Sequence, residues 1–382
     1  MTKRAVVLGC GLVGATIVRD LSDDPEFEVT AADLSEHNLR RVDGPMRVNT
    51  CKTDLSDPRA VGSLVADADI VLGALPSRFG FQTLKTVIEA GKPYCDISFM
   101  PEDAQELDTL ARRHGVTAVV DCGVSPGLSH LIVGHAYGQF DAANEAVIYV
   151  GGLPKIRRWP YEYKAPFAPA DVLEIYTRPA RMLENGQVVA KAALSEPELI
   201  EFPCAGTLEA FNTDGLRSLL STIPIPNMKE KTLRYPGHVQ LMRILRESGF
   251  LGKDGIEVGG SNVRPIDVTA NLLFPLWKLE EDEEEFTVLR VVIDGVKDGI
   301  PKRYTYDLYD EFDRATATTS MARTTGFPCT IVARMIINGQ LSDPGVFPPE
   351  SLPKVQGVFE HVLQELEKRG VTVAQSVEDL AD

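Results

Sequence analysis

The feature that most constrains the fold is a run of glycines near the N-terminus, Gly9-Cys10-Gly11-Leu12-Val13-Gly14. The apolar stretch Arg4–Leu8 precedes it, and Ala15–Leu21 continues with helical spacing. A GxGxxG pattern between a strand and a helix is typical of a dinucleotide-binding turn. In such a turn the first glycine makes the tight bend, the second lets a pyrophosphate approach the backbone at the helix N-terminus, and the third lets helix and strand pack closely. We therefore expect Gly9, Gly11, Leu12, Val13 and Gly14 to bind a cofactor.

An acidic residue follows at the distance that such a turn requires. A second apolar stretch, Glu28–Ala32, ends in Asp33, about 20 residues beyond the last glycine. A carboxylate at this position bonds the ribose hydroxyls and repels a 2′-phosphate, which favours NAD over NADP. Arg40 and Arg41 follow within reach, so some tolerance of NADP stays open. The alternative is a glycine turn and a strand-end aspartate without any ligand.

Apolar and helical segments continue to alternate as far as Val120, which predicts an α/β Rossmann fold with a doubly wound parallel sheet. Ligands bind such sheets beyond the carboxyl ends of the strands. The residues expected along that rim are Asp33, Asp54, Leu75, Pro76, Ser77, Asp96 and Asp121. Asp54 either contacts the adenine or caps a helix, and Leu75 and Pro76 line the cofactor by shape alone.

The pattern changes after the loop Asp121–Gly127. Two β-type stretches, Phe286–Asp294 and Tyr304–Tyr309, flank a predicted hairpin turn, and the acidic run Glu280–Glu285 is expected to be a solvated loop. Val355–Arg369 is amphipathic and has no strand of its own to cover, so we expect it to pack on the nucleotide domain. The predicted organisation is a discontinuous NAD-binding domain, 1–124 with 322–382, and an inserted α+β domain for substrate binding or dimerisation, 125–321.

Composition limits the partners. The 382 residues carry a net charge of −16, which disfavours nucleic acid and anionic membranes. The six cysteines show neither metal-ligand spacing nor a disulfide pattern, so we expect no metal and a reducing, cytoplasmic location. We find no apolar run of about 20 residues that would span a membrane. A small-molecule substrate and a homodimer or higher homo-oligomer remain the expected partners.

Several motifs resemble a known group of enzymes. Gly9–Gly14 with Asp33, and the loop Asp121–Gly127, resemble the saccharopine dehydrogenase superfamily. Four further stretches resemble one branch of this superfamily, the lysine 6-dehydrogenases. They are Tyr149–Pro154, Leu208–Phe211, Lys231–His238 and Met321–Thr325. The resemblance implies NAD-dependent oxidation of the side-chain amine of L-lysine or a related amino acid. The product would be 2-aminoadipate 6-semialdehyde, which cyclises to 1-piperideine-6-carboxylate, with release of ammonia.

Two other functions stay open. One is a saccharopine or carboxynorspermidine dehydrogenase or reductase of the same fold, which would prefer NADPH. The other is a non-catalytic protein that senses NAD and turns over no amine.

Amine oxidation needs a base, and an amino-acid substrate needs a fixed cation for its carboxylate. Asp121 and His238 are the catalytic candidates, with a loop-capping role and a surface position as their respective alternatives. Arg234 is expected to bind the substrate carboxylate. Asp214 is expected to take an ammonium group and Thr213 to add a hydroxyl contact, although a plain turn would also explain this pair. Arg323 either pairs with a cofactor phosphate or caps its own helix.

Overall fold

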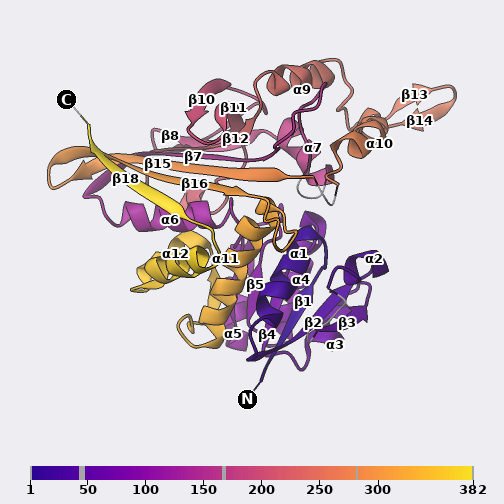
Figure 1. Cartoon of the computed structure of the whole chain (residues 1–382), viewed down its shortest axis with the longest axis vertical. Coiled ribbons are helices and arrows are strands. Elements are labelled where there is room, and N and C mark those ends of the chain that lie inside the picture. Colours follow the sequence, from indigo (N-terminus) through magenta and orange to yellow (C-terminus); the bar gives the residue numbers. More distant parts are fainter. Residues whose placement is uncertain (1, 43–47, 166–168, 281–282, 381–382) are drawn as a thin grey trace. The chain divides into compact units, whose positions relative to one another are not determined.

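The computed structural model describes residues 2–42, 48–165, 169–280 and 283–380. The chain divides into two compact units, one made of Met1–His135 with Ala322–Thr372 and the other of Ala136–Met321 with Val373–Asp382 (Figure 1). The nucleotide unit is therefore built from both ends of the chain. The last ten residues depart from the expected division, because strand β18 (Val373–Asp379) pairs with a strand of the second unit.

The nucleotide unit contains a parallel sheet with the order β17-β6-β5-β4-β1-β2-β3, seven strands within the described residues. Its strands are β1 (Lys3–Leu8), β2 (Phe27–Asp33), β3 (Val48–Lys52), β4 (Ile70–Gly73), β5 (Tyr94–Asp96), β6 (Thr117–Val119) and β17 (Gly345–Phe347). The strands at the centre are apolar and buried because helices cover both faces of the sheet. Strand order reverses between β1 and β4, which confirms the predicted doubly wound Rossmann fold.

The helices of this unit are α1 (Leu12–Ser22), α2 (Glu36–Leu39), α3 (Pro58–Val65), α4 (Ser77–Glu89), α5 (Asp108–His114) and α12 (Val358–Lys368), with short 3₁₀ turns at Ala104–Leu107 and Pro349–Lys354. Two further helices, α6 (Leu128–Tyr137) and α11 (Ser320–Ile337), run across the division between the units. The amphipathic tail helix α12 buries Val358, Phe359, Val362 and Leu366, and Phe359 stacks on His135.

A buried ion network joins α1 to the C-terminal part of the nucleotide unit. The carboxylate of Asp20 accepts hydrogen bonds from Arg334 at 2.6 Å and from Arg369 at 2.7 Å, and all three side chains are at most 16% exposed. Burial alone would raise the pKa of Asp20, but the two guanidinium groups hold it below its usual range. The network is one reason why segments more than 300 residues apart belong to one unit.

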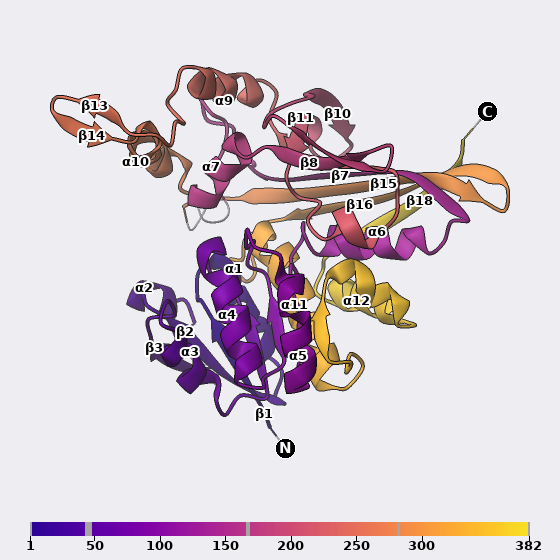
Figure 2. The ribbon, with the colours of Figure 1, turned by 180° about the vertical axis from the view of Figure 1, so that it is seen from behind.

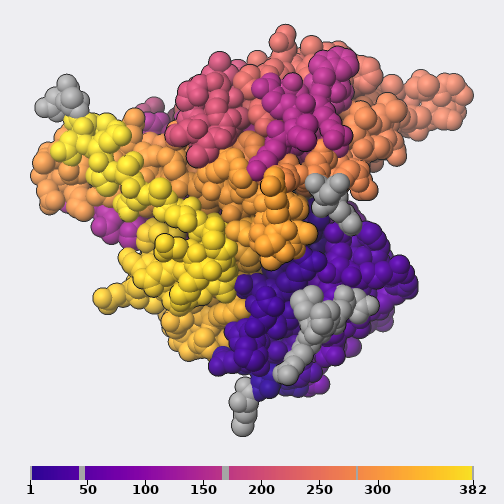
Figure 3. All heavy atoms as spheres, in the orientation of Figure 1, coloured from indigo at the N-terminus to yellow at the C-terminus, as the bar shows by residue number. Residues whose placement is uncertain are grey.

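The second unit is built on a mixed sheet with the main order β10-β11-β12-β7-β15-β16-β18 (Figure 2). Its remaining strands are β7 (Ala142–Pro154), β8 (Ala180–Glu184), β9 (Gln187–Lys191), β10 (Glu198–Phe202), β11 (Gly206–Thr213), β12 (Asn227–Arg234), β15 (Glu285–Lys297) and β16 (Ile300–Glu311). The helices are α7 (Pro169–Thr177), α8 (Leu219–Thr222), α9 (His238–Glu247) and α10 (Pro265–Trp277). A separate small hairpin, β13 (Ile256–Val258) with β14 (Ser261–Val263), stands out from this unit in the space-filling view (Figure 3).

The predicted hairpin between the two β-type stretches is present and longer than expected. Strands β15 and β16 pair from Phe286–Glu311 to Lys297–Ile300, so the turn itself is Asp298-Gly299. Both turn residues have positive φ, the geometry that a two-residue hairpin turn requires.

The prediction of a solvated loop for Glu280–Glu285 is wrong for two of its members. Glu283 and Glu285 are buried, at 8% and 1% exposure. The Glu285 carboxylate accepts hydrogen bonds from the backbone of Ser320 and Met321, at the start of α11. A carboxylate at this end complements the helix dipole, which explains why an acidic side chain is buried here. Glu281 and Asp282 lie outside the described residues.

Candidate active site

The glycine turn of the nucleotide unit has the geometry of a phosphate-binding turn. Gly9 has φ +96°, and a side chain there would overlap the carbonyl oxygen of Ala74. A Cβ on Gly14 would overlap the Gly9 carbonyl, so this glycine permits the close packing of α1 on β1. A Cβ on Gly11 would meet nothing within 4 Å. Gly11 therefore marks the open side of the turn, where a phosphate can approach the N-terminus of α1.

The other residues expected near the cofactor lie around this turn. Leu12 and Val13 are the first two residues of α1. The Leu75 side chain lies against Gly9, Pro76 is the N-cap of α4 and Ser77 is its first helical residue. Two helix N-termini thus lie beside the strand-order reversal, which suits an anionic dinucleotide.

Asp33 is held in place at the end of β2. Its carboxylate accepts hydrogen bonds from the backbone of Cys10 at 2.8 Å and of Ser35 at 2.8 Å, and from the Asn38 amide at 3.1 Å. The bond to Cys10 links the carboxylate to the glycine turn, so its negative charge is fixed where the glycine motif places a ribose.

Asp54 has a local role in the structure. Its carboxylate accepts hydrogen bonds from the backbone and the hydroxyl of Ser56, while Asp57 provides the N-cap of α3. Asp54 therefore stabilises a local turn through Ser56, and Asp57, not Asp54, caps the helix.

Asp96 is fully buried at the end of β5. One oxygen accepts hydrogen bonds from the backbone and the hydroxyl of Ser98. Burial, assisted by the nearby charge of Asp121, raises the pKa of Asp96 to about 7. The carboxyl group lies inside the unit and not on an open rim, so it does not offer the exposed contact that we expected for a cofactor-binding residue.

Asp121 begins the loop that follows β6. It is 5% exposed and adopts a left-handed conformation with φ +53°. The adjacent backbone of Cys122 donates to the Asp96 carbonyl, which ties this loop to the end of β5. Two carboxyl groups therefore lie in one buried region at the carboxyl ends of adjacent strands.

Three further polar side chains of this loop region were not identified from the sequence. The hydroxyl of Ser129 donates to Ser125 at 3.0 Å, and its oxygen also lies 3.0 Å from Nδ1 of the buried His130. All three belong to Ser125-Pro126-Gly127-Leu128-Ser129-His130. The only signal in the sequence is a histidine and two serines directly after the glycine-containing loop.

In the second unit, His238 is buried between aromatic residues and is not on the surface. Its Nε2 lies 2.9 Å from the Tyr176 hydroxyl and its Nδ1 lies 2.9 Å from the Tyr161 carbonyl. Burial, and then the charge of Arg234, lowers its pKa to about 3. His238 is therefore neutral near pH 7, and this environment does not fit the proton shuttle expected from an ordinary imidazole.

Arg234 lies in the same buried cluster and is 2% exposed. Its Nε donates to the Tyr176 hydroxyl at 3.2 Å and its Nη1 to the Leu233 carbonyl at 2.8 Å, whereas Nη2 has no hydrogen-bond partner among the residues that the structure describes. The guanidinium stacks 4.3 Å from the centre of the Tyr163 ring. Two neighbouring donors, the Tyr163 hydroxyl and the Trp277 indole nitrogen, are also buried without a partner in the described part of the chain. A buried arginine without a bonded carboxylate is unusual, because buried charges are normally paired.

Thr213 and Asp214 have their polar groups occupied within the second unit. The Asp214 carboxylate is bidentate to Arg181, at 2.8 and 2.9 Å. The Thr213 hydroxyl bonds the buried carboxyl of Glu230 and also contacts Thr232. Burial raises the pKa of Glu230 to about 7. These contacts favour the structural alternative for the pair, and they identify Glu230 as a buried carboxyl that we had not singled out.

Arg323 also forms a hydrogen bond within its own unit. It donates to the Arg369 carbonyl at 3.1 Å, at the end of α12. This contact is neither of the two roles considered for it from the sequence.

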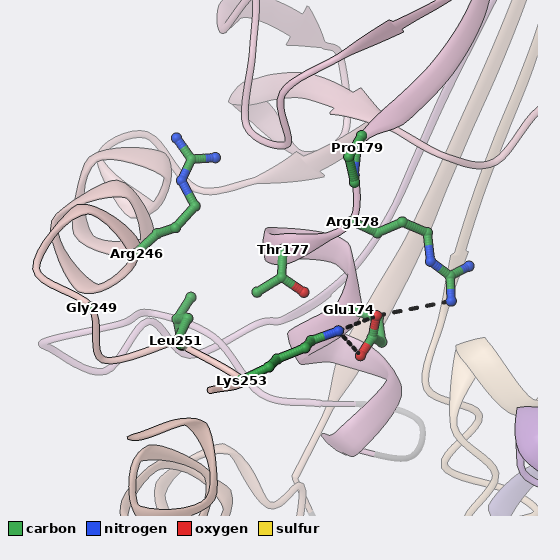
Figure 4. Close-up of a pocket in the computed structure, with 9 residues that line it drawn as sticks. Glu174, Thr177, Arg178, Pro179, Arg246, Gly249, Leu251 and Lys253 are labelled. Carbon is green, nitrogen blue, oxygen red and sulfur yellow. Dashed lines mark hydrogen bonds and ion pairs between the residues drawn. The ribbon is translucent and has the colours of Figure 1, made fainter. Parts of the chain in front are cut away.

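A cavity of about 500 Å³ opens in the second unit between α7 and α9 (Figure 4). Its lining residues are Glu174, Thr177, Arg178, Pro179, Arg246, Gly249, Leu251, Gly252 and Lys253. Lys253 pairs with Glu174 at 2.9 Å. The cavity contains none of the residues predicted for the active site.

Two classes of site are not found in the described part of the chain. Residues 2–42, 48–165, 169–280 and 283–380 contain no group of three or more histidine, cysteine or acidic residues arranged to hold a metal ion. None of the described helices is both long and apolar enough to cross a membrane.

Comparisons with known proteins agree with this geometry. Residues 5–119 match the saccharopine dehydrogenase NADP binding domain, and residues 123–371 match the saccharopine dehydrogenase C-terminal domain. The NADP-dependent, L-glutamate-forming saccharopine dehydrogenase of Saccharomyces cerevisiae is 22% identical, over 92% of this chain and 94% of that protein. Carboxyaminopropylagmatine dehydrogenase of Synechocystis is 23% identical, over 91% of this chain and 92% of that protein.

A longer relative and a solved structure complete the comparison. Mouse mitochondrial alpha-aminoadipic semialdehyde synthase is 25% identical over 66% of this chain, which spans 29% of that protein. The structure of the yeast saccharopine dehydrogenase superimposes with a TM-score of 0.82 at 19% identity, covering 98% of this chain and 100% of that one. Since the matched domains together span nearly the whole chain, this protein belongs to the saccharopine dehydrogenase family.

Proposed function

We propose that this protein is an NAD-dependent dehydrogenase that oxidises the side-chain amine of L-lysine or a closely related amino acid. The amine loses two electrons and a proton as a hydride, and water then hydrolyses the resulting imine to an aldehyde and ammonia. From lysine the product is 2-aminoadipate 6-semialdehyde, which closes to 1-piperideine-6-carboxylate. The observation that carries this proposal is Arg234, a buried guanidinium with an unpartnered nitrogen that suits a substrate carboxylate.

The nucleotide unit fits a dinucleotide cofactor. Gly11 leaves open space at the N-terminus of α1, and the Asp33 carboxylate is fixed beside the glycine turn. A bound nicotinamide cofactor supplies the acceptor for the hydride. The fixed charge of Asp33 supports NAD over NADP, because it would repel a 2′-phosphate. The NADP dependence stated for the yeast relative makes this choice the first one to test.

Asp121 is the proposed base. Amine oxidation requires the neutral amine, so a carboxylate that accepts a proton from the ammonium group helps the reaction. Asp121 lies at the carboxyl end of β6, the edge of a doubly wound sheet at which ligands bind. His238 is not assigned this role, because its pKa of about 3 makes it a weak base and both of its ring nitrogens already have partners.

Arg234 is the proposed carboxylate-binding residue, and Tyr176 positions it. The Tyr176 hydroxyl receives the Nε bond and also contacts His238, so the neutral imidazole helps to hold the tyrosine. Thr213 bonds Glu230 and Asp214 bonds Arg181, so we assign both residues a structural role and do not propose that they bind an ammonium group.

The test is a screen of L-lysine, saccharopine, related amino acids and diamines with NAD and with NADP, read as reduced cofactor. The proposal expects lysine with NAD to give the largest kcat/KM. A preference for saccharopine, or for NADPH with an aldehyde and an amino compound, would instead support the second candidate, which the yeast and Synechocystis relatives favour. Cofactor binding without turnover of any substrate would favour a non-catalytic NAD sensor.

A further inference from the structure

The cluster around Arg234 contains three buried polar groups that lack a hydrogen-bond partner among the described residues. They are Nη2 of Arg234, the hydroxyl of Tyr163 and the indole nitrogen of Trp277, on residues that are at most 3% exposed. The guanidinium and the indole are donors only, and burial raises the pKa of Tyr163 to about 13, so its hydroxyl also keeps its proton. Each buried donor without an acceptor costs free energy, so three of them in one cluster require an explanation.

These three residues pack together although they come from distant parts of the second unit. The guanidinium of Arg234 lies 4.3 Å from the centre of the Tyr163 ring, and the ring centres of Tyr163 and Trp277 are 5.5 Å apart. Arg234 is the last residue of β12 and Trp277 the last of α10, while Tyr163 lies in the segment between β7 and α7. Three segments thus bring one donor each to the same place, which a local turn does not explain.

The polar groups next to the three donors are already occupied. The Tyr176 hydroxyl accepts the Nε bond of Arg234 and also contacts Nε2 of His238, whose other ring nitrogen lies 2.9 Å from a backbone carbonyl. The charge of Arg234 also acts on the carboxyl of Glu230, but that group bonds the hydroxyl of Thr213. These contacts leave the three donors to a group from outside the described part of the chain.

The donors and their charge indicate a singly charged oxyanion. Arg234 supplies one positive charge, and His238 adds none because its pKa is lowered to about 3 and its ring is neutral. A water molecule accepts hydrogen bonds but brings no charge against the buried guanidinium, whereas a carboxylate brings one charge and two oxygens with about four positions for donors. Guanidinium groups bind carboxylates through short, strong hydrogen bonds. A carboxylate therefore fits both the charge and the donors of the cluster.

We propose that Tyr163 and Trp277 complete a three-donor site with Arg234 that binds the carboxylate of the amino-acid substrate. This inference rests on the proposed function, since it adds two residues to the carboxylate-binding role assigned there to Arg234. A site built for an oxyanion leaves its buried donors unpaired when the ligand lacks one, so amino acids are accepted and amines without a carboxylate are rejected. Tyr163 and Trp277 therefore determine the specificity for a carboxylate.

The two added donors lie close to the surface of the unit. Both chain neighbours of Tyr163 are partly exposed, and the neighbours of Trp277, Leu276 and Lys278, are exposed. Each donor is therefore on a buried residue between residues that reach solvent, which places the site within reach of a small ligand.

The first test compares two buried tyrosines whose hydroxyls differ in their partners. Tyr163→Phe removes a donor that the fold leaves unpaired, so the unfolding temperature of the ligand-free protein is expected to stay the same or to rise. The matched control is Tyr235→Phe, because the Tyr235 hydroxyl donates to the Pro154 carbonyl at 2.8 Å. Loss of that bond is expected to lower the unfolding temperature by about 2–4 °C. An equal loss in the two variants would give the Tyr163 hydroxyl a structural bond and overturn the proposal.

The second test measures binding of ligands that carry no oxidisable side-chain amine. L-norleucine carries a carboxylate and an α-ammonium group, hexanoate only the carboxylate, and pentylamine only the ammonium group. The chain contains two tryptophans, and Trp159 is 88% exposed, so the variant Trp159→Phe leaves the fluorescence of Trp277 as a report on the cluster. With NAD or NADP present, norleucine and hexanoate are expected to change this emission saturably, and pentylamine is expected to leave it unchanged.

The tyrosine variants then show which hydroxyl the ligand uses. In the Trp159→Phe background, Tyr163→Phe is expected to weaken the binding of norleucine and hexanoate about 10-fold, the loss expected for one hydrogen bond to a charged group. Tyr235→Phe is expected to leave their affinity unchanged. Trp277→Phe, followed by calorimetry, is expected to show a loss similar to that of Tyr163→Phe. Equal binding of pentylamine, no response to hexanoate, or full affinity in Tyr163→Phe would each overturn the proposal.

Because these ligands are not oxidised, the binding results do not depend on turnover. Saturable binding of norleucine by a protein that does not oxidise lysine would refute the proposed function and leave the carboxylate site in place. Oxidation of lysine with the same KM in the wild type and in Tyr163→Phe would refute the three-donor site alone.

Discussion

Two buried clusters of charge, one in each unit, differ in a way that separates structural from functional residues. In the nucleotide unit, Asp20 is bonded by Arg334 and Arg369, so each charge has an opposite partner. In the second unit, Arg234 is buried among Tyr163, Tyr176 and His238, and within the described residues none of its hydrogen bonds goes to a carboxylate. The first cluster is complete within the described residues, and we propose that a ligand anion completes the second.

The physical basis of this difference between the two clusters is the free-energy cost of removing a charge from water. A buried pair compensates this cost through mutual attraction, and breaking one side of it is strongly destabilising. Arg234 is held by the Tyr176 hydroxyl, the Leu233 carbonyl and the face of the Tyr163 ring, which are all uncharged, so part of the cost of burying its charge is not compensated. Substrate binding can then gain energy by supplying the missing anion. The contrast predicts opposite effects of mutation in the two clusters.

The largest effect is expected for Asp20→Ala, which leaves Arg334 and Arg369 without their shared carboxylate. The free energy of unfolding should fall by about 3–5 kcal/mol, while the KM for the amine substrate of the folded enzyme stays unchanged. Because the pKa of Asp20 is lowered in the fold, the wild-type network is fully stabilising above the usual carboxyl pKa and is lost as the pH falls through and below it. Denaturant unfolding at pH 7 and pH 3 measures both effects. Asp54→Ala, which removes an exposed carboxylate, serves as the control, and an equal loss in the two variants would contradict the prediction.

A smaller stability effect is expected for Glu230→Gln, beside the Arg234 cluster. Burial raises the pKa of Glu230 to about 7, so the folded protein keeps a proton that the unfolded chain releases near its ordinary value. Wild-type stability should therefore fall as the pH rises between about 4.5 and 7, by about 3 kcal/mol at most, and then level off. Glutamine does not titrate, so the variant should match the wild type at pH 4.5 and exceed its stability at pH 8. Glu247→Gln, at an exposed position, should show no such difference between the two pH values.

The two clusters also differ in how far the sequence predicts them. The Rossmann unit follows from local signals: the spacing of Gly9, Gly11 and Gly14, the distance to Asp33, and short apolar strands. These signals act on the backbone of one turn, so a single stretch of sequence contains them. The role of α12 in the same unit was also predictable, because its apolar face requires a partner.

The second unit depends on pairs that are distant in the sequence. The Asp214 carboxylate accepts hydrogen bonds from Arg181, 33 residues away in the sequence, and the residues around Asp214 do not predict this ion pair. The sequence left His238 as either a catalytic base or a surface histidine, because Tyr161 and Tyr176, which bury it, lie far away in the chain. Burial of Glu285 depends on the N-terminus of α11, 35 residues further on. Residue type, within the stretch Lys231–His238 that resembles a known enzyme group, identified Arg234 as a candidate. Only the structure shows that one of its nitrogens has no partner among the described residues.

The comparison is tested most directly by Arg234→Met, which removes the charge and keeps an apolar side chain of similar length. The KM for the amino-acid substrate is expected to rise about 10–100-fold, the range set by losing a charge-assisted hydrogen bond. Stability should be unchanged or slightly higher, because replacing a buried charge with an apolar group is often neutral or stabilising. The control is Arg314→Met, at an exposed position in the same unit. Loss of several kcal/mol of stability without a change in KM would place Arg234 with the structural cluster.

The smallest effect concerns a third fixed charge, the Asp33 carboxylate, whose hydrogen-bond donors within the described residues are all neutral. In this respect it resembles Arg234 and not Asp20, so its charge should act on a ligand and contribute little to the fold. Asp33→Asn keeps an acceptor for the ribose hydroxyls and removes the repulsion of a 2′-phosphate, so the ratio of kcat/KM for NADP to that for NAD should rise about 10-fold, equivalent to about 1.4 kcal/mol. Asp54→Asn, which alters an exposed carboxylate in a local turn, should leave the ratio unchanged. A wild type that already prefers NADP would show that the neighbouring arginines, Arg40 and Arg41, outweigh Asp33. The charge that decides cofactor choice would then be cationic.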